Sequence, residues 1–262
     1  YLLADAFWPG PLTMIFKKTD RVPMATTGGL PTVAVRMPSN KIAAALIRAA
    51  GGYIAAPSAN RSGRPSPTVA KYVIEDLDGR VEMIIDGGFS TIGLESTIID
   101  LSEGEPMILR PGYVTQEKMT QVIGNVDVDR TILDASSKQA PKAPGMKYRH
   151  YAPKGNLTIV EGPQEKVTAC INEKLSEGHK QGLKTGVIAT DETIEQYEAD
   201  VKRSLGSRKN EEAIAHHLFE VLRQMDDEEV QLIFTESFAE TGLGQATMNR
   251  LLKAAGHQVI SL

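Results

Sequence analysis

Short β-branched runs alternate with longer helical stripes along this chain, and one stretch shows neither pattern. Short apolar runs bounded by Pro and Gly predict strands, and apolar residues at helical spacing between them predict helices. Strands alternating with helices are typical of an α/β fold. The interruption, residues 127–153, mixes Ser, Pro, Gly and Lys without any period and predicts a linker.

Residues 1–126 form the first predicted domain, an α/β unit with a twisted mixed sheet. One helix is expected over 42–50 after a cap at Ser39, and a second is expected to start at Ser66-Pro67 and to stop at Gly79. The predicted strands are residues 12–18, 32–37, 53–56, 81–86, 96–100 and 107–110.

Residues 154–262 form the second predicted domain, which is smaller. Helical stripes cover 167–175 and 214–225, and each lies between apolar runs. Strands joined by crossover helices predict a small parallel sheet, so this domain is expected to be Rossmann-like. The predicted strands are residues 157–160, 186–190, 230–235 and 257–262.

Composition excludes several classes of protein. The single cysteine, Cys170, permits no internal disulfide and falls beside a helical stripe, which predicts a small core residue. The sequence has no run of about 18 apolar residues, so no membrane span is expected. With 29 Lys and Arg against 33 Asp and Glu, the net charge of -4 argues against a protein that coats nucleic acid. The cytoplasm is the expected location.

Residues 57–63, with the sequence PSANRSG, follow a predicted strand and precede a predicted helix. Small hydroxyl and amide side chains beside Gly, placed before a helix N-terminus, expose donors that suit an anion such as phosphate. An ordinary capped turn has the same composition, and this alternative stays open.

Two arginines and one serine lie at the ends of predicted strands. Arg36 ends 32–36, Arg110 ends 107–110, and Ser96 stands at the start of another strand. A guanidinium at a strand end of an α/β sheet can point into the ligand crevice, although it can also lie in solvent or pair with an Asp. Ser96 has no nearby His and no nucleophile-elbow glycine, so a ligand-contacting hydroxyl or a plain strand cap is favoured over a hydrolase nucleophile.

Taken in order, six motifs resemble those of the YrdC-type threonylcarbamoyl-AMP synthases. The trailing α/β unit and HYAP resemble the long, two-domain form of that family. The motifs are WPGPLT (8–13), TVAVRMP (32–38), PSANRSG (57–63) with SPT (66–68), ESTIID (95–100), LRPG (109–112) and HYAP (150–153).

The resemblance implies an enzyme, a nucleotidyltransferase that makes L-threonylcarbamoyl-AMP and pyrophosphate from L-threonine, bicarbonate and ATP. Mg²⁺ would accompany ATP. The product would pass to a separate complex that modifies an adenosine of tRNA. The threonine amine would capture carbon dioxide, and the carbamate oxygen would attack the α-phosphorus, so the substrate would supply the nucleophile. The alternatives are a non-catalytic nucleotide- or RNA-binding module of the same fold, and a hydrogenase-maturation carbamoyltransferase, which would need cysteine-rich metal motifs that this chain lacks.

The resemblance also assigns residues to the two substrates. Threonine would contact Arg36, Ala56 and Ser96. The chain is expected to supply no catalytic side chain and no metal ligand. The nucleotide would contact Thr32, Ser58, Asn60, Ser66, Arg110 and Tyr151, the last of which would reach back from the linker to close over ATP.

Two further expectations concern the start of the chain and the role of the second domain. The family normally begins with a further segment that contains a Lys-x-Arg cluster, and nothing before Tyr1 supplies it. The chain is therefore expected to be truncated at its N-terminus and weakly active or inactive by itself. The second domain shows no site of its own and is expected to act as a lid or spacer controlled by the linker.

Overall fold

The computed structural model describes residues 1–129, 151–239 and 241–262, and its contacts group them into two units. Unit 1 contains Tyr1–Ser58 and the described residues from Glu95 onward, up to residue 129. Unit 2 contains Ala59–Leu94 and the described residues from 151 to the end. Most of the predicted linker, residues 130–150, lies outside the described residues. The segment 59–94 belongs to the predicted first domain, yet it packs with the C-terminal part of the chain.

Unit 1 is built on a five-stranded mixed sheet in the order β2-β1-β3-β4-β5. β1 runs antiparallel to β2 and parallel to β3, and β3 runs antiparallel to β4. The helices of this unit are α1 (Leu2–Phe7), α2 (Lys41–Ala49) and α4 (Gln116–Ile123). The strands are β1 (Leu12–Lys17), β2 (Thr32–Val35), β3 (Thr97–Asp100), β4 (Met107–Arg110) and β5 (Asp127–Val128).

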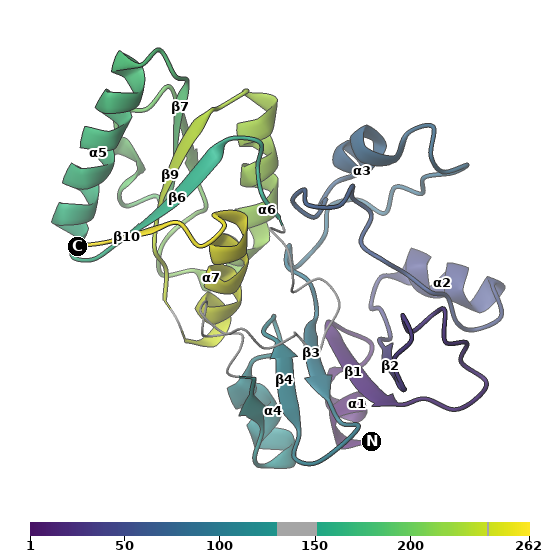
Figure 1. The fold of residues 1–262 in the computed structure, drawn as a ribbon. Coiled ribbons are helices and arrows are strands. Elements are labelled where there is room, and N and C mark those ends of the chain that lie inside the picture. The colour runs from purple at the N-terminus through teal and green to yellow at the C-terminus, as the bar shows by residue number, and fades with distance from the viewer. Residues whose placement is uncertain (130–150, 240) are drawn as a thin grey trace. The chain divides into compact units, whose positions relative to one another are not determined.

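The core of unit 1 lies between the sheet and the helices α1 and α4 (Figure 1). Leu12, Met14 and Ile99 are buried on this face, where Met119 of α4 and Leu3 of α1 pack on them. The WPGPLT motif lies beside this core, where Trp8 packs against the buried residues and its indole Nε1 donates to the Leu12 carbonyl at 2.7 Å.

Unit 2 contains a fully parallel five-stranded sheet in the order β10-β6-β9-β7-β8, which confirms the Rossmann-like prediction. Its helices are α3 (Ala70–Leu77), α5 (Gln164–Lys180), α6 (Glu211–Asp227) and α7 (Gly242–Ala254), with a 3₁₀ turn η2 (Ile194–Gln196). Its strands are β6 (Asn156–Glu161), β7 (Thr185–Ala189), β8 (Val201–Ser204), β9 (Leu232–Glu236) and β10 (Val259–Ser261).

Both faces of this parallel sheet are covered, as its near-continuous apolar strands require. One face packs on α5, where Val160, Val187 and Phe234 meet Ile171, and Cys170 lies half-buried against the same cluster, as predicted. α6 and α7 lie together on the other side of the sheet (Figure 1). No helix in the described parts of the chain is both long and apolar enough to cross a membrane.

Four sequence predictions of secondary structure are wrong. The helix expected to start at Ser66-Pro67 begins later, since α3 runs over Ala70–Leu77 with Val69 as its N-cap. Residues 53–56 and 81–86 form no strand, and Tyr53 and Met83 are 86% and 77% exposed. Apolar composition alone does not make a strand, because a strand needs a neighbour to take its backbone hydrogen bonds. The cap of α2 is Asn40 instead of Ser39, since the Asn40 Oδ1 accepts from two helix amides at 3.0 Å each.

We expect Thr97→Val to destabilise unit 1. The Thr97 hydroxyl donates to the Val114 carbonyl at 2.7 Å and accepts from the Val114 amide at 3.1 Å, and both residues are buried. The nearly isosteric Val leaves both backbone groups unpaired, which costs about 2 kcal/mol or more. Urea unfolding followed by the fluorescence of Trp8, the one tryptophan of the chain, measures this loss.

The control is Thr120→Val on the exposed side of α4, which should shift the unfolding free energy by no more than about 0.5 kcal/mol. An equally small shift for Thr97→Val would contradict the structural role of its hydroxyl.

Candidate functional site: a sheet edge and a loop with unpaired polar atoms

Strand directions place two of the predicted site residues at one edge of the unit 1 sheet. β1 and β3 begin at this edge and β4 ends there, because Leu12 pairs with Thr97 and Ile98 pairs with Arg110. Ser96 precedes β3 and Arg110 closes β4. The sequence predicted that both residues contact a ligand, and the fold brings them together.

The two side chains are in direct contact. Arg110 donates from Nε and Nη2 to the Ser96 carbonyl at 3.0 and 2.9 Å, and from Nη2 to the Ser96 Oγ at 3.2 Å. Ser96 Oγ also lies 2.7 Å from the Thr13 hydroxyl. Gly112 of the LRPG motif lies against the backbone of Thr97, because a Cβ at this position would come within 2.6 Å of the Thr97 amide nitrogen. The glycine therefore permits the backbone after β4 to approach the start of β3 this closely. A guanidinium and two hydroxyls thus form one fixed cluster.

Arg36 lies at the same edge. It follows Val35, which pairs with Met14, and precedes Met37, whose carbonyl accepts from the Gly10 amide at 2.8 Å. Arg36 is exposed and has no carboxylate partner among the residues that the structure describes. The alternative that this arginine pairs with an Asp is therefore not observed.

The remaining unit 1 candidates are not brought to this edge by any observed contact. Thr32 pairs with Lys17 at the opposite end of β2, four residues or roughly 13 Å along the strand from Arg36. Ala56 and Ser58 are exposed in a segment without helix or strand.

The part of the predicted anion loop that belongs to unit 2, from residue 59 onward, is folded on itself by Asn60. The Asn60 amide nitrogen donates to the carbonyls of Arg61 and Arg64 at 3.0 and 3.3 Å. The end of the HYAP motif lies on this loop, because the Ala152 amide donates to the Gly63 carbonyl at 3.0 Å. Tyr151 has φ of 66°, and its ring packs 5.1 Å from that of Phe219. Asn60, Ser66 and Tyr151, all assigned to the nucleotide, thus belong to one unit.

Three buried polar atoms on residues 60–68 have no hydrogen-bond partner among the described residues. They are Asn60 Oδ1, Arg64 Nε and Thr68 Oγ1. Buried polar groups in native proteins are nearly always paired, so a group of unpaired atoms on one loop marks a place where a ligand or ordered water completes the bonding. One acceptor, one donor and one hydroxyl of this segment are therefore without a hydrogen-bond partner among the described residues.

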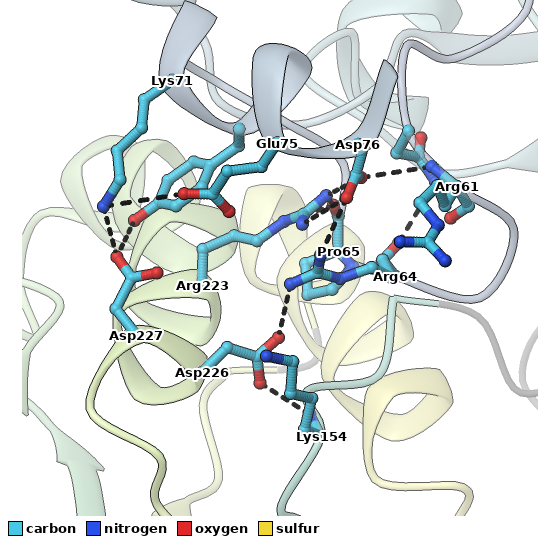
Figure 2. Close-up of polar contacts among 12 residues, drawn as sticks. Arg61, Arg64, Pro65, Lys71, Glu75, Asp76, Lys154, Arg223, Asp226 and Asp227 are labelled. Carbon is cyan, nitrogen blue, oxygen red and sulfur yellow. Dashed lines mark hydrogen bonds and ion pairs between the residues drawn. The ribbon is translucent and has the colours of Figure 1, made fainter. Parts of the chain in front are cut away.

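Sequence reasoning missed the ion pairs that hold this loop. Arg223 of α6 pairs with Asp76 of α3, and both side chains are fully buried. Arg64 bridges Asp76 and Asp226 (Figure 2). The partners Arg223 and Asp76 are 147 residues apart, and no local pattern in the sequence connects residues at such a separation.

These contacts set the ionisation of Asp76. Burial by itself would raise the pKa of this carboxyl, but hydrogen bonds from Arg223 and the Arg61 amide, with the charges of Arg223 and Arg64, lower the pKa below its ordinary value of 3.8. Asp76 is therefore ionised in the folded protein. The described residues contain no group of three His, Cys, Asp or Glu side chains placed to hold a metal ion.

Two family models cover nearly the whole chain. The model described as "Telomere recombination" matches residues 1–112, and the model described as "Threonylcarbamoyl-AMP synthase, C-terminal domain" matches residues 114–256. The threonylcarbamoyl-AMP synthase of Pyrococcus abyssi is 48% identical over 261 residues, which are 100% of this chain and 75% of that protein. The chain belongs to the threonylcarbamoyl-AMP synthase family.

Other members of the threonylcarbamoyl-AMP synthase family are similar to this chain over nearly its whole length. The Bacillus subtilis protein is 47% identical over 259 residues, covering 98% of this chain and 73% of its own length, and the Schizosaccharomyces pombe protein is 37% identical over 268 residues, covering 97% and 65%. The crystal structure of P. abyssi Sua5 complexed with L-threonine superposes with a TM-score of 0.91 at 48% identity and covers 100% of this chain and 75% of that one. The predicted family, enzyme class and fold are confirmed.

We expect Asp76→Asn to remove a pH-dependent part of the stability. Because the folded pKa is depressed, the carboxylate stabilises the fold fully above 3.8, and this contribution disappears as pH falls through the lower folded value. At pH 7 the variant leaves the buried Arg223 charge uncompensated and should lose about 3 to 5 kcal/mol. Thermal unfolding followed by circular dichroism should show the difference from wild type narrowing below about pH 4.

Asp78→Asn serves as control, because Asp78 lies two residues along the chain and is exposed. A wild-type advantage of the same size at pH 7 and pH 3 would contradict the depressed pKa.

Proposed function

We propose that the chain catalyses the synthesis of L-threonylcarbamoyl-AMP and pyrophosphate from L-threonine, bicarbonate and ATP. The observation that carries this proposal is the set of unpaired buried polar atoms on Asn60, Arg64 and Thr68, in a chain of the threonylcarbamoyl-AMP synthase family. The P. abyssi relative, which was solved in complex with L-threonine, supports threonine as one substrate. We further propose that the reaction takes place in the cytoplasm and that the product passes to a separate complex that modifies tRNA.

The chemistry requires placement of two anions and no side-chain nucleophile. The threonine amine adds to carbon dioxide derived from bicarbonate and loses a proton, which gives a carbamate. One carbamate oxygen then forms a bond to the α-phosphorus, and the bond from that phosphorus to the β-phosphate oxygen breaks, releasing pyrophosphate. Guanidinium groups and hydroxyls suit this task, because they offset the repulsion between carbamate and triphosphate.

The sheet edge of unit 1 supplies such groups. We assign the threonine carboxylate or carbamate to Arg36 and the threonine side to Ser96, with Ala56 offering backbone. Arg110 is assigned to the phosphates. Since Arg110 and Ser96 are in direct contact, they would meet the two substrates where the new bond forms.

The loop of unit 2 supplies the nucleotide side. Asn60 Oδ1 would accept from an adenosine donor, and Thr68 Oγ1 and Arg64 Nε would offer further polar contacts to ATP. Ser66, Tyr151 and, in unit 1, Thr32 and Ser58 complete the proposed nucleotide set. Mg²⁺ would enter with ATP and be held by its phosphates, where it would neutralise charge on the leaving pyrophosphate.

The activity test measures pyrophosphate release with threonine, bicarbonate and ATP together and with each omitted in turn. The 262-residue chain is assayed. Release that needs all three substrates, with threonylcarbamoyl-AMP identified by mass spectrometry, is the expected result. Release that does not depend on threonine would contradict the proposal.

We expect Arg36→Ala to weaken threonine binding selectively. Loss of one charge-assisted hydrogen bond of about 1.5 to 3 kcal/mol corresponds to roughly a ten- to hundredfold loss of affinity. Calorimetric titration should show this loss for threonine, while the affinity for a non-hydrolysable ATP analogue changes by less than about twofold. Arg48→Ala, at another arginine of unit 1, is the matched control. Equal losses of threonine and nucleotide affinity would refute the assignment.

A further inference from the structure

Arg223 of α6 binds one end of the loop 60–66. Its side chain is fully buried, and it donates from Nε and Nη2 to the Pro65 carbonyl at 2.9 and 2.6 Å. The residue that follows, Ser66, is one of the proposed nucleotide contacts. The position of this part of the loop is therefore set by a helix of the C-terminal sequence.

The same guanidinium also fixes the position of the other end of the loop, at Arg61, through Asp76. Arg223 Nη1 and Nη2 donate to Asp76 Oδ1 and Oδ2 at 3.2 and 2.6 Å, and Asp76 Oδ2 accepts from the Arg61 amide at 3.1 Å. Figure 2 shows the arginine between these partners. Because a paired guanidinium and carboxylate have a fixed mutual geometry, residues 61 and 65 are held at a defined separation.

Asp226, one turn along α6, connects the loop to the segment after the linker. Its Oδ2 accepts from Arg64 Nη2 at 3.1 Å, and its Oδ1 accepts from the Lys154 amide at 2.6 Å. This segment also donates to the loop at Gly63. A single carboxylate thus links the loop that carries Asn60 to the chain that carries Tyr151.

The charges of this network cancel internally. Arg64 and Arg223 are balanced by Asp76 and Asp226, and three of these four side chains are almost completely buried. Desolvation offsets much of the attraction in such a cluster, so buried pairs are weak evidence for net stability and are better suited to specifying one geometry. The atoms left for a ligand, Arg64 Nε among them, depend on that geometry.

We propose that Arg223 and Asp226 are positioning residues for nucleotide binding, acting through the loop 60–66 without touching the substrate. Helix α6 of unit 2 would then contribute to the reaction by fixing the loop that binds the nucleotide. This inference rests on the proposed function for the identity of the ligand, while the positioning itself can be measured without any ligand.

The chain provides a matched control on the same pair of helices. Lys71 of α3 donates to Asp227 of α6 at 2.6 Å, and Asp227 also accepts from the Tyr72 hydroxyl. This ion pair is partly exposed, and none of the hydrogen bonds and ion pairs described for Lys71 and Asp227 reaches residues 60–66. Asp227→Asn therefore weakens the same helix contact while keeping the hydrogen bonds to the loop.

The test compares Asp226→Asn and Arg223→Lys with Asp227→Asn in the complete protein. Amide hydrogen exchange at Arg61, Ala152 and Lys154 reports the loop, and KM for ATP and for threonine are measured separately. We expect exchange at these amides to speed up by about tenfold in the first two variants, since charge-assisted bonds that hold the loop and its neighbouring segment in place are lost. KM for ATP should rise by about tenfold, with KM for threonine within about twofold of wild type.

Each outcome decides the inference. If exchange and KM for ATP change no more than in Asp227→Asn, the network is only structural and the proposal is overturned. If Arg223→Lys does not fold, Asp226→Asn decides alone by the same criteria. If wild type shows no ATP-dependent activity, the proposed function fails; exchange then still shows whether these residues fix the loop.

Discussion

The buried contact between Arg223, Asp76 and the Pro65 carbonyl is the interaction on which the described loop depends. Residues 59–69 form no helix or strand, so the loop lacks the hydrogen-bond ladder that fixes most backbone. Side chains replace that ladder: Asn60 within the loop, Asp76 at Arg61, and Arg223 at Pro65. A guanidinium has the fixed fork of donors needed to hold a carboxylate and a carbonyl together, and a lysine ammonium does not.

In this arrangement the charged side chains that hold the loop in place differ from the polar atoms that remain for a ligand. Arg64 and Arg223 are already balanced by aspartates, so the loop contains single unpaired, buried polar atoms rather than a field of positive charge. At the sheet edge, Arg36 is exposed and Arg110 is fixed against Ser96. Such a division suits a reaction whose substrates carry the nucleophile and the leaving group, because the protein then has to orient two anions and exclude other arrangements.

Periodicity and motifs predicted much of the fold, and the failures have physical causes. The strands β1, β3 and β4 and four strands of the parallel sheet of unit 2 follow from apolar runs between turn residues, because burial of those runs decides their structure. β8 (Val201–Ser204) was not predicted, because its sequence VKRS is not an apolar run. Residues 53–56 and 81–86 have similar composition but no partner strand in the described structure. Ser96 and Arg110 were predicted as ligand contacts. Their direct contact with each other could not be predicted from the sequence, since it depends on the register between β3 and β4. The network around Arg223 joins segments far apart in sequence, and a single sequence contains no signal for such pairing.

We propose that residues 60–68 bind the nucleotide while the sheet edge at Ser96 and Arg110 contacts the threonine derivative. The decisive measurement is a crystal structure of the protein with L-threonine and a non-hydrolysable ATP analogue. We expect nucleotide donors and acceptors within hydrogen-bonding distance of Asn60 Oδ1 and Thr68 Oγ1, and threonine beside Ser96. A nucleotide bound elsewhere, with the loop atoms still unpaired or paired only with water, would contradict it.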